Sequence, residues 1–192
     1  MPGRHPIILT LIAVFLFTTC KKGEDDPVIS LRSRTTRLTG EWRLVSGTAG
    51  YTTNGYNDTF SFTGTDFREN LTTAYLTTYI GKYILKLNIA KDGTFSFKEF
   101  LAGSTLDASG TWNFNNGIGE DKKKEDVIFT IDKVNAGYTN SYYNPFNRGC
   151  TNFVYKIKEL RNAKLVIHSS GKVYSNSRAD YVTLSTDYTF IQ

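Results

Sequence analysis

The chain has 192 residues, of which 40% are hydrophobic and 14% aromatic, enough apolar material for one folded domain of ordinary size. The formal net charge is +5, and the basic residues are scattered apart from Lys122–Lys124, which acidic residues flank on both sides. This distribution lacks the clustered basic face of nucleic-acid-binding proteins, so we expect no nucleic-acid partner.

The first twenty residues have the form of a secretory leader. Arg4 supplies a positive charge, and the apolar run 7–17 fits the core of a signal peptide, whereas a membrane span needs about 20 apolar residues. The residues Phe17-Thr18-Thr19-Cys20 resemble a bacterial lipobox. This resemblance implies a signal peptide at 1–19 and lipidation of Cys20, which would anchor the protein to the outer membrane of a cell envelope. Cleavage by the ordinary signal peptidase and an uncleaved membrane anchor are the two alternatives.

A polar and charged segment follows the cysteine. Residues 20–37 bury little apolar surface, and we expect them to form a flexible tether. The acids Glu24–Asp26 also resemble the surface-export signal of some Gram-negative lipoproteins, so the periplasmic and the extracellular face both stay open. With Cys20 lipidated, Cys150 has no partner within the chain, and we expect a tolerated free thiol rather than a disulfide framework.

The folded domain is expected to span residues 38–192 and to open with a strand at Leu38–Ser46. Within that strand Trp42 and Leu44 alternate with polar residues, which is typical of a strand with one buried face. Residues 47–57 are rich in Gly, Thr, Asn and Tyr, and this composition predicts a loop.

The next three segments differ in how clearly they predict a structure. Residues 59–63 indicate a short strand, whereas 65–78 mix helical spacing with β-branched threonines and are interpreted as a loop. The clearest signal lies in 83–100, where two alternating runs flank Asp92-Gly93. Asp-Gly between alternating runs predicts a hairpin, because the turn needs a positive φ that glycine adopts without a Cβ clash.

The second half of the chain is dominated by further strand candidates. Apolar residues alternate in 109–115, Val127–Ile131, Phe153–Ile157, Leu165–Ile167 and Val182–Tyr188. A tight connection at 161–163 joins two of these strands, and a long loop is expected between Lys133 and Thr151. Eight or nine strands with short turns suggest a barrel or a sandwich, and closure removes unpaired edges. We predict an all-β fold, an antiparallel up-and-down β-barrel of about eight strands.

Four short motifs occur in an order found in a known family. They are Leu38–Leu44 with its Gly-x-Trp, Lys91–Phe95 with Asp-Gly-Thr-Phe, Gly110–Phe114 with a second Gly-x-Trp, and Tyr155–Ile167. In this order they resemble the bacterial lipocalin-like lipoproteins over residues 38–190. The resemblance implies an up-and-down barrel with a cup, but no particular ligand.

Residues that could carry catalysis or bind a metal are scarce. His168, the one histidine beyond the leader, is expected to point outward, and no Ser-His-Asp set or three-ligand zinc site can be selected. Glu120, Asp121, Glu125 and Asp126 lie among lysines and are interpreted as a solvated turn rather than a calcium site. We therefore expect no enzyme, no cofactor and no metal.

Aromatic residues of two expected loops are the leading candidates for ligand contact, because rigid aromatic rings supply contact area at low entropic cost. They are Tyr51, Tyr56, Tyr138, Tyr142, Tyr143 and Phe146. The plain alternative is that these loops pack over one end of the barrel. Two functions follow: binding of a small hydrophobic or amphipathic ligand, or interaction with a protein or glycan partner by a barrel filled with side chains.

Overall fold

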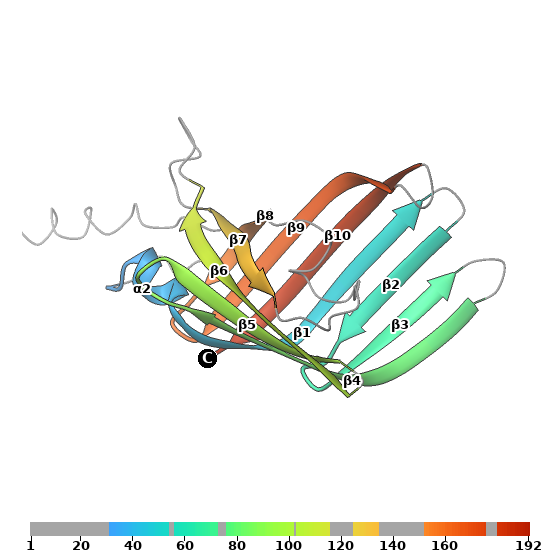
Figure 1. The fold of residues 1–192 in the computed structure, drawn as a ribbon, viewed down its shortest axis with the longest axis horizontal. Helices are drawn as coiled ribbons and strands as arrows, with labels where there is room; N and C mark the ends of the chain where they lie inside the picture. Colours follow the sequence, from blue (N-terminus) through green and yellow to red (C-terminus); the bar gives the residue numbers. More distant parts are fainter. Residues whose placement is uncertain are drawn as a thin grey trace, which may run out of the picture.

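The structure, a computed structural model, describes residues 31–53, 56–72, 76–101, 103–115, 125–134, 152–175 and 180–192. Ten antiparallel strands form one closed barrel in the order β1-β10-β9-β8-β7-β6-β5-β4-β3-β2 (Figure 1). Their bounds are β1 Gly40–Thr53, β2 Tyr56–Phe62, β3 Asp66–Thr72, β4 Leu76–Ile89, β5 Thr94–Leu101, β6 Ser104–Phe114, β7 Asp126–Val134, β8 Asn152–Leu160, β9 Lys164–Ser175 and β10 Asp180–Ile191. The predicted all-β barrel is confirmed.

The barrel has ten strands rather than about eight because segments expected to be loops form strands. The expected loop 47–57 contains the second half of β1 and the start of β2, and the expected loop 65–78 contains β3 and the start of β4. Gly, Asn and Asp are depleted in strands, so the local composition concealed pairing that depends on neighbouring strands.

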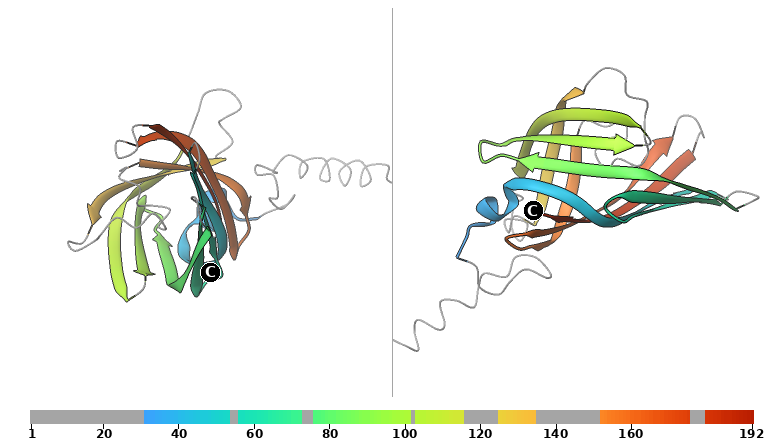
Figure 2. Two further views of the ribbon diagram at one scale, coloured as in Figure 1. Left: turned by 90° about the vertical axis from the view of Figure 1, so that its right-hand side faces the viewer. Right: turned by 90° about the horizontal axis from the view of Figure 1, so that it is seen from below.

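Strand β1 pairs with three other strands, and this divides the barrel into two ends. Its residues Gly40–Arg43 pair with Lys86–Ile89 of β4, whereas Gly47–Thr53 pair with β2. The β2–β3 hairpin therefore separates β1 from β4 at one end only, which we call the wide end (Figure 2). At the opposite, narrow end β1 pairs directly with β4, so β2 and β3 are not part of the barrel wall there.

The tip of the β2–β3 hairpin fills the fork between β1 and β4. The backbone N–H of Tyr83 donates to the carbonyl of Thr65 at 2.9 Å and ties the tip to β4. Gly64 has φ +86°, and a Cβ there would lie 3.0 Å from Val45 Cα and 3.1 Å from the Leu44 carbonyl oxygen. Glycine suits this position both for its backbone conformation and for the close approach to β1.

The narrow end is filled by a continuous apolar core, as the alternating sequence predicts. Eleven inward or helix-borne side chains have no exposed surface: Leu38, Leu44, Tyr83, Leu85, Val127, Phe129, Ile157, Leu160, Leu165, Ile167 and Phe190. Burying one such apolar side chain contributes about 1.5–3 kcal/mol relative to leaving it exposed. This core is the main source of stability of the fold.

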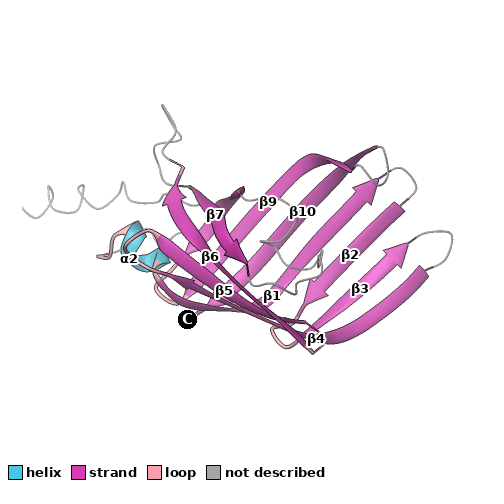
Figure 3. Ribbon diagram, in the orientation of Figure 1, coloured by secondary structure: helices cyan, strands magenta, loops and turns pink. Residues whose placement is uncertain are grey.

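A short helix, α2 (Arg34–Leu38), lies at the narrow end (Figure 3). Ser33 caps it by accepting a hydrogen bond from the Thr36 N–H, and Arg37 donates to the carbonyl oxygen of Leu160 in β8. The indole Nε1 of Trp42 donates to the Leu38 carbonyl at 2.8 Å, so the buried ring keeps its polar atom satisfied. Residues 34–37 were expected in the tether, but they belong to this helix.

The predicted turn at Asp92-Gly93 is confirmed as the β4–β5 connection. Gly93 has φ +89°, and the Ala90 N–H donates to the Thr94 carbonyl at 2.9 Å. The Asp92 carboxylate accepts hydrogen bonds from the hydroxyl and the N–H of Thr94, and these bonds lower the pKa of Asp92. The predicted tight connection at 161–163 is also present, closed by a bond from Arg161 N–H to the Lys164 carbonyl at 2.8 Å.

Candidate functional site

The inner face of the wide end is arranged in rows, because antiparallel neighbours place inward side chains opposite one another. The deepest row crosses β10, β1, β2, β3 and β4, and we call it the aromatic floor. It consists of Tyr188, Gly47, Phe62, Phe67 and Gly81. The three aromatic side chains are buried, with at most 7% of their surface exposed.

Two glycines of the floor make room for the rings beside them. A Cβ at Gly47 would lie 2.6 Å from Cδ1 of Tyr188, and one at Gly81 would lie 2.5 Å from Cε1 of Phe67. Each ring thus covers the backbone of the neighbouring strand. The centroid of the Phe62 ring lies 5.8 Å from that of Tyr188, which completes a packed layer.

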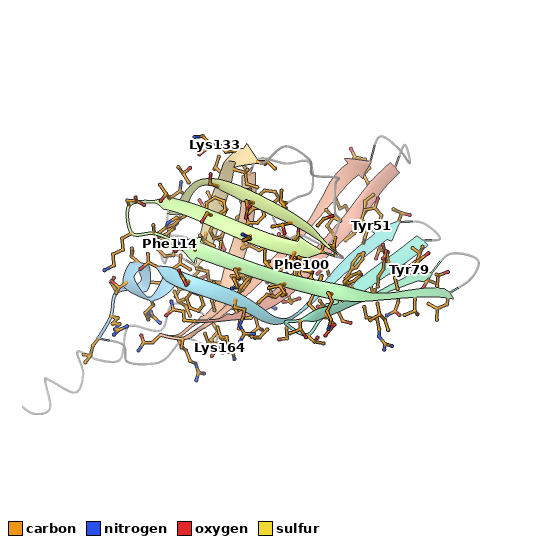
Figure 4. The ribbon with its side chains drawn as sticks, turned by 60° about the horizontal axis from the view of Figure 1, so that its bottom comes forward. Tyr51, Tyr79, Phe100, Phe114, Lys133 and Lys164 are labelled. Carbon is orange, nitrogen blue, oxygen red and sulfur yellow. The ribbon has the colours of Figure 1, made fainter. Side chains whose placement is uncertain are left out.

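Above the floor lie two further rows, which we call the upper inner wall. Their side chains are a mixture of aromatic, aliphatic, hydroxyl and carboxylate groups. The lower of the two rows is Thr186, Ala49, Phe60, Glu69 and Tyr79, and the upper is Leu184, Tyr51, Asp58, Leu71 and Thr77. Tyr51 and Tyr79 lie toward the same end of the barrel in Figure 4.

The exposed fraction of several side chains is larger in the upper inner wall than in the aromatic floor. Tyr188 in the floor is 1% exposed, Tyr51 and Leu184 in the wall are half-buried, and Tyr79 is 52% exposed. Asp58, in contrast, is a buried carboxylate of the same wall. The upper inner wall therefore combines available apolar surface with a few polar groups, which is the usual lining of a small-molecule site.

Of the six aromatic residues predicted to contact a ligand, the structure describes two. Tyr51 lies in β1 on the upper inner wall and Tyr56 begins β2, so the prediction that both belong to a loop is wrong. The other four predicted aromatic residues, Tyr138, Tyr142, Tyr143 and Phe146, lie outside the described residues, as do Cys20 and Cys150.

Sequence reasoning missed the contribution of the β2–β3 hairpin to this wall. Phe60, Asp58, Glu69 and Leu71 all come from it. The signal was present in part, because Asp58 shares the parity of Phe60 in the predicted short strand. Glu69 and Leu71 carried no usable signal, since the segment around them had no consistent period.

A groove of about 790 Å³ lies on the outer face, across β1, β4, β5, β6 and the end of β7. We call it the outer groove. Its outward-facing side chains are Glu41, Arg43, Lys86, Asn88, Ser96, Lys98, Asp107, Ser109, Lys133, Ile191 and Gln192. Four of these are cationic and two are acidic, so the groove carries an excess of positive charge.

His168 points outward, as predicted, and pairs with an acid. Its Nδ1 lies 3.0 Å from Oδ1 of Asp187, and the Nζ of Lys158 lies 3.1 Å from the same oxygen. Within the described ranges no hydroxyl or thiol bonds to the His168 ring, so a nucleophile next to the base is not among the contacts seen.

The acidic turn expected at 120–126 is described only from Glu125 onward, and Glu120 and Asp121 lie outside. Asp126 begins β7, and the Glu125 carbonyl accepts from the Ile157 N–H at 2.6 Å. Across the part of the chain that the structure describes, no three His, Cys, Asp or Glu side chains gather as a metal site. The same part contains no helix with the length and apolar character of a membrane span.

No family model, curated protein or solved structure matches this chain. The function is therefore inferred from the barrel itself.

Proposed function

We propose that this protein is a lipid-anchored lipoprotein of the cell envelope whose lipocalin-like barrel binds a small hydrophobic or amphipathic ligand against the upper inner wall. One observation carries the proposal: the inner face changes from a packed aromatic floor to a wall of mixed chemistry, in which buried and partly exposed side chains lie together. The rings of Tyr51 and Tyr79 and the side chain of Leu184 offer apolar contact. Hydroxyl and carboxylate groups between them suit the polar part of an amphipathic molecule.

The shape of the barrel favours the same end. The width of a barrel grows with the number of strands around it, and a barrel of about eight strands has an interior just large enough for side chains. At the narrow end β1 pairs directly with β4, and the core there is solid. At the wide end β2 and β3 lie between β1 and β4, and the sheet of β10, β1, β2, β3 and β4 extends beyond the pairing of β4 with β5, which begins at Tyr83. Ala49 and Thr186 in the lower row of the wall are small and buried, so a larger side chain at either position would alter the wall.

Ligand binding is tested with the mature chain, residues 20–192 with Cys20→Ser, which lacks the apolar leader, cannot be acylated and is purified without detergent. The neutral fluorescent probe N-phenylnaphthylamine should bind with enhanced emission. Ala49→Trp places an indole in the middle of the upper inner wall and should abolish this emission. Thr48→Trp, at the adjacent and outward-facing position, is the matched control and should leave it unchanged.

Circular dichroism establishes that each variant is folded. If Ala49→Trp does not fold, Thr77→Trp and Thr78→Trp form a second pair, since both threonines are exposed and face opposite sides of β4. Equal emission from the inner and outer variants of a pair would refute the site. It would favour the alternative of a filled barrel that acts as a protein- or glycan-interaction module.

The anchor is tested separately. Acyl chains on a cysteine contribute about 0.8 kcal/mol for each buried CH₂, and more than one chain holds a protein stably on a membrane. The N-terminal peptide of the protein purified from cells should begin at Cys20 with a mass that includes acyl chains. The mature chain, residues 20–192 with Cys20→Ser, has neither leader nor acyl chains and should be absent from the membrane fraction. An unmodified Cys20 would contradict the lipoprotein assignment without bearing on the barrel.

A further inference from the structure

Three cationic side chains stand side by side on the outer face of the barrel. Arg43 of β1 is directly opposite Lys86 of β4, and Lys86 is directly opposite Lys98 of β5. Like charges at directly opposed positions of a sheet are destabilising. This cation row therefore works against the stability of the folded protein.

Acidic partners offset little of this charge. Asp107 of β6 continues the row, and its Oδ1 lies 3.9 Å from the Nζ of Lys98. That pair is largely exposed to water and contributes at most about 1 kcal/mol. Among the described residues, Arg43, Lys86 and the nearby Lys133 form no ion pair at all.

The rows on either side of the cations have different chemistry. On the side toward the narrow end, one row presents a carboxylate, an amide and two hydroxyls, from Glu41, Asn88, Ser96 and Ser109. On the side toward the wide end, Ile84 lies opposite Phe100 and forms an apolar row.

The apolar side continues along the outer face of β4. Ile80 is 65% exposed and Leu76 is 70% exposed, and both share the parity of Ile84. The outer groove thus holds hydrogen-bonding groups and cations, and exposed apolar side chains of β4 lie next to it on the side of Ile84.

We propose that the outer groove binds the phosphate-bearing headgroup of an amphipathic lipid. A phosphate concentrates negative charge and several acceptor oxygens in one compact group, and the Arg43 guanidinium and two neighbouring ammonium groups complement it. Hydroxyls of the headgroup bond to the row of Asn88, and the apolar part of the lipid lies toward Ile84. The site is on the opposite side of the sheet from the upper inner wall, so each site can fail without the other.

The test is flotation of the mature chain, residues 20–192 with Cys20→Ser, with vesicles, because this chain has neither the apolar leader nor an acyl anchor. Vesicles that contain phosphatidylglycerol should carry the protein, and vesicles of phosphatidylcholine alone should carry much less. Added salt should weaken the binding, since the contacts involve exposed charges.

The double variant Lys86→Gln/Lys98→Gln removes two charges of the cation row and should weaken vesicle binding roughly thirtyfold. The control Lys156→Gln/Lys172→Gln removes two exposed outward charges from β8 and β9 and should keep most of it. Equal losses in the two double variants would show that vesicle binding depends only on the net charge of the protein. This result would overturn the proposed site.

Two further measurements distinguish a lipid ligand from a soluble one. Glycerol phosphate in solution should bind far more weakly than the vesicles in titration calorimetry. Equally tight binding of soluble glycerol phosphate, or binding of a soluble anionic polysaccharide in place of vesicles, would overturn the assignment to a lipid.

A stability measurement checks the row without any ligand. Lys86→Gln relieves repulsion on both sides and should raise the thermal midpoint relative to Lys156→Gln. A lower midpoint for Lys86→Gln would show that the cation row stabilises the sheet and would contradict the argument for a bound anion.

Discussion

The two ends of the barrel share most of their strands but present different inner faces. At the narrow end the inward side chains are almost entirely aliphatic or aromatic, and they are inaccessible to water. At the wide end the same strands continue next to β2 and β3, and the inner face gains carboxylates, hydroxyls and half-exposed rings. The inserted hairpin thus separates the part of the barrel that supplies stability from the part that offers a binding surface.

The largest effect that separates the two ends is expected from truncation of inward side chains. Phe129→Ala in the narrow end should cost about 3–5 kcal/mol of unfolding free energy, because its ring is fully buried among other rings. Leu184→Ala in the upper inner wall should cost about 1 kcal/mol or less, since the side chain is half-buried. Urea unfolding measures both. A similar cost at the two positions would remove the distinction between the ends.

The next largest effect on stability is expected from alanine substitutions at two glycines, one at each end of the barrel. A Cβ at Gly110 in β6 would lie 1.8 Å from the backbone oxygen of Thr130, so Gly110→Ala must displace β7 and should cost about 1–3 kcal/mol or more. No atom lies within 4 Å of a Cβ at Gly50 in the wide end, and Gly50→Ala should gain about 0.5 kcal/mol. Thermal unfolding of the two variants should shift in opposite directions. A loss at Gly50 would argue against the space seen around it.

The narrow end could be predicted from the sequence, and the wide end could not. Alternation in Val127–Ile131 and Phe153–Ile157 is visible because water on one side and core on the other force opposite chemistry at successive positions. Along the β2–β3 hairpin the inner face is mixed, because Asp58 and Glu69 lie beside Phe60, while the outer face is polar. The alternation of apolar and polar residues is therefore not visible in the sequence of this segment, although it forms two strands. The hairpin pairs with β1 and β4, and a pattern within the hairpin's own sequence gives no information about these neighbours.

The candidate site was predictable only to the same extent. Tyr51 was selected for its aromatic ring, but as a loop residue, because glycines and threonines surround it. The cation row is harder still to predict. Arg43, Lys86 and Lys98 are far apart in the chain, and only the register of three strands brings them together.

A smaller effect concerns the turn at the narrow end. Hydrogen bonds from Thr94 lower the pKa of Asp92 in the folded protein below the ordinary value of an aspartate. The ionised carboxylate therefore stabilises the fold above that value, and this contribution is lost as the pH falls through the folded pKa. Asp92→Asn should be less stable at neutral pH and lose less stability on acidification. Urea unfolding at neutral and acidic pH tests this, and identical slopes would contradict it.

The smallest effect is expected on the outer face away from the groove. Asp187→Asn disrupts the contacts with His168 and Lys158, but these groups are partly exposed and their ion pairs contribute about 1 kcal/mol at most. Probe binding by the upper inner wall should not change, because Asp187 faces outward. Loss of probe binding in a folded Asp187→Asn variant would mean that the outer and inner faces of β10 are coupled.

The most direct test of the division between a filled and a binding end is native mass spectrometry. The mature chain, residues 20–192 with Cys20→Ser, is purified from cells without detergent, and Ala49→Trp is added in the same chain for comparison. We predict a bound small-molecule mass that disappears on denaturation and is absent from the Ala49→Trp chain. A clean apo mass in the parent chain, or an equal bound mass in both, would contradict a ligand site on the upper inner wall.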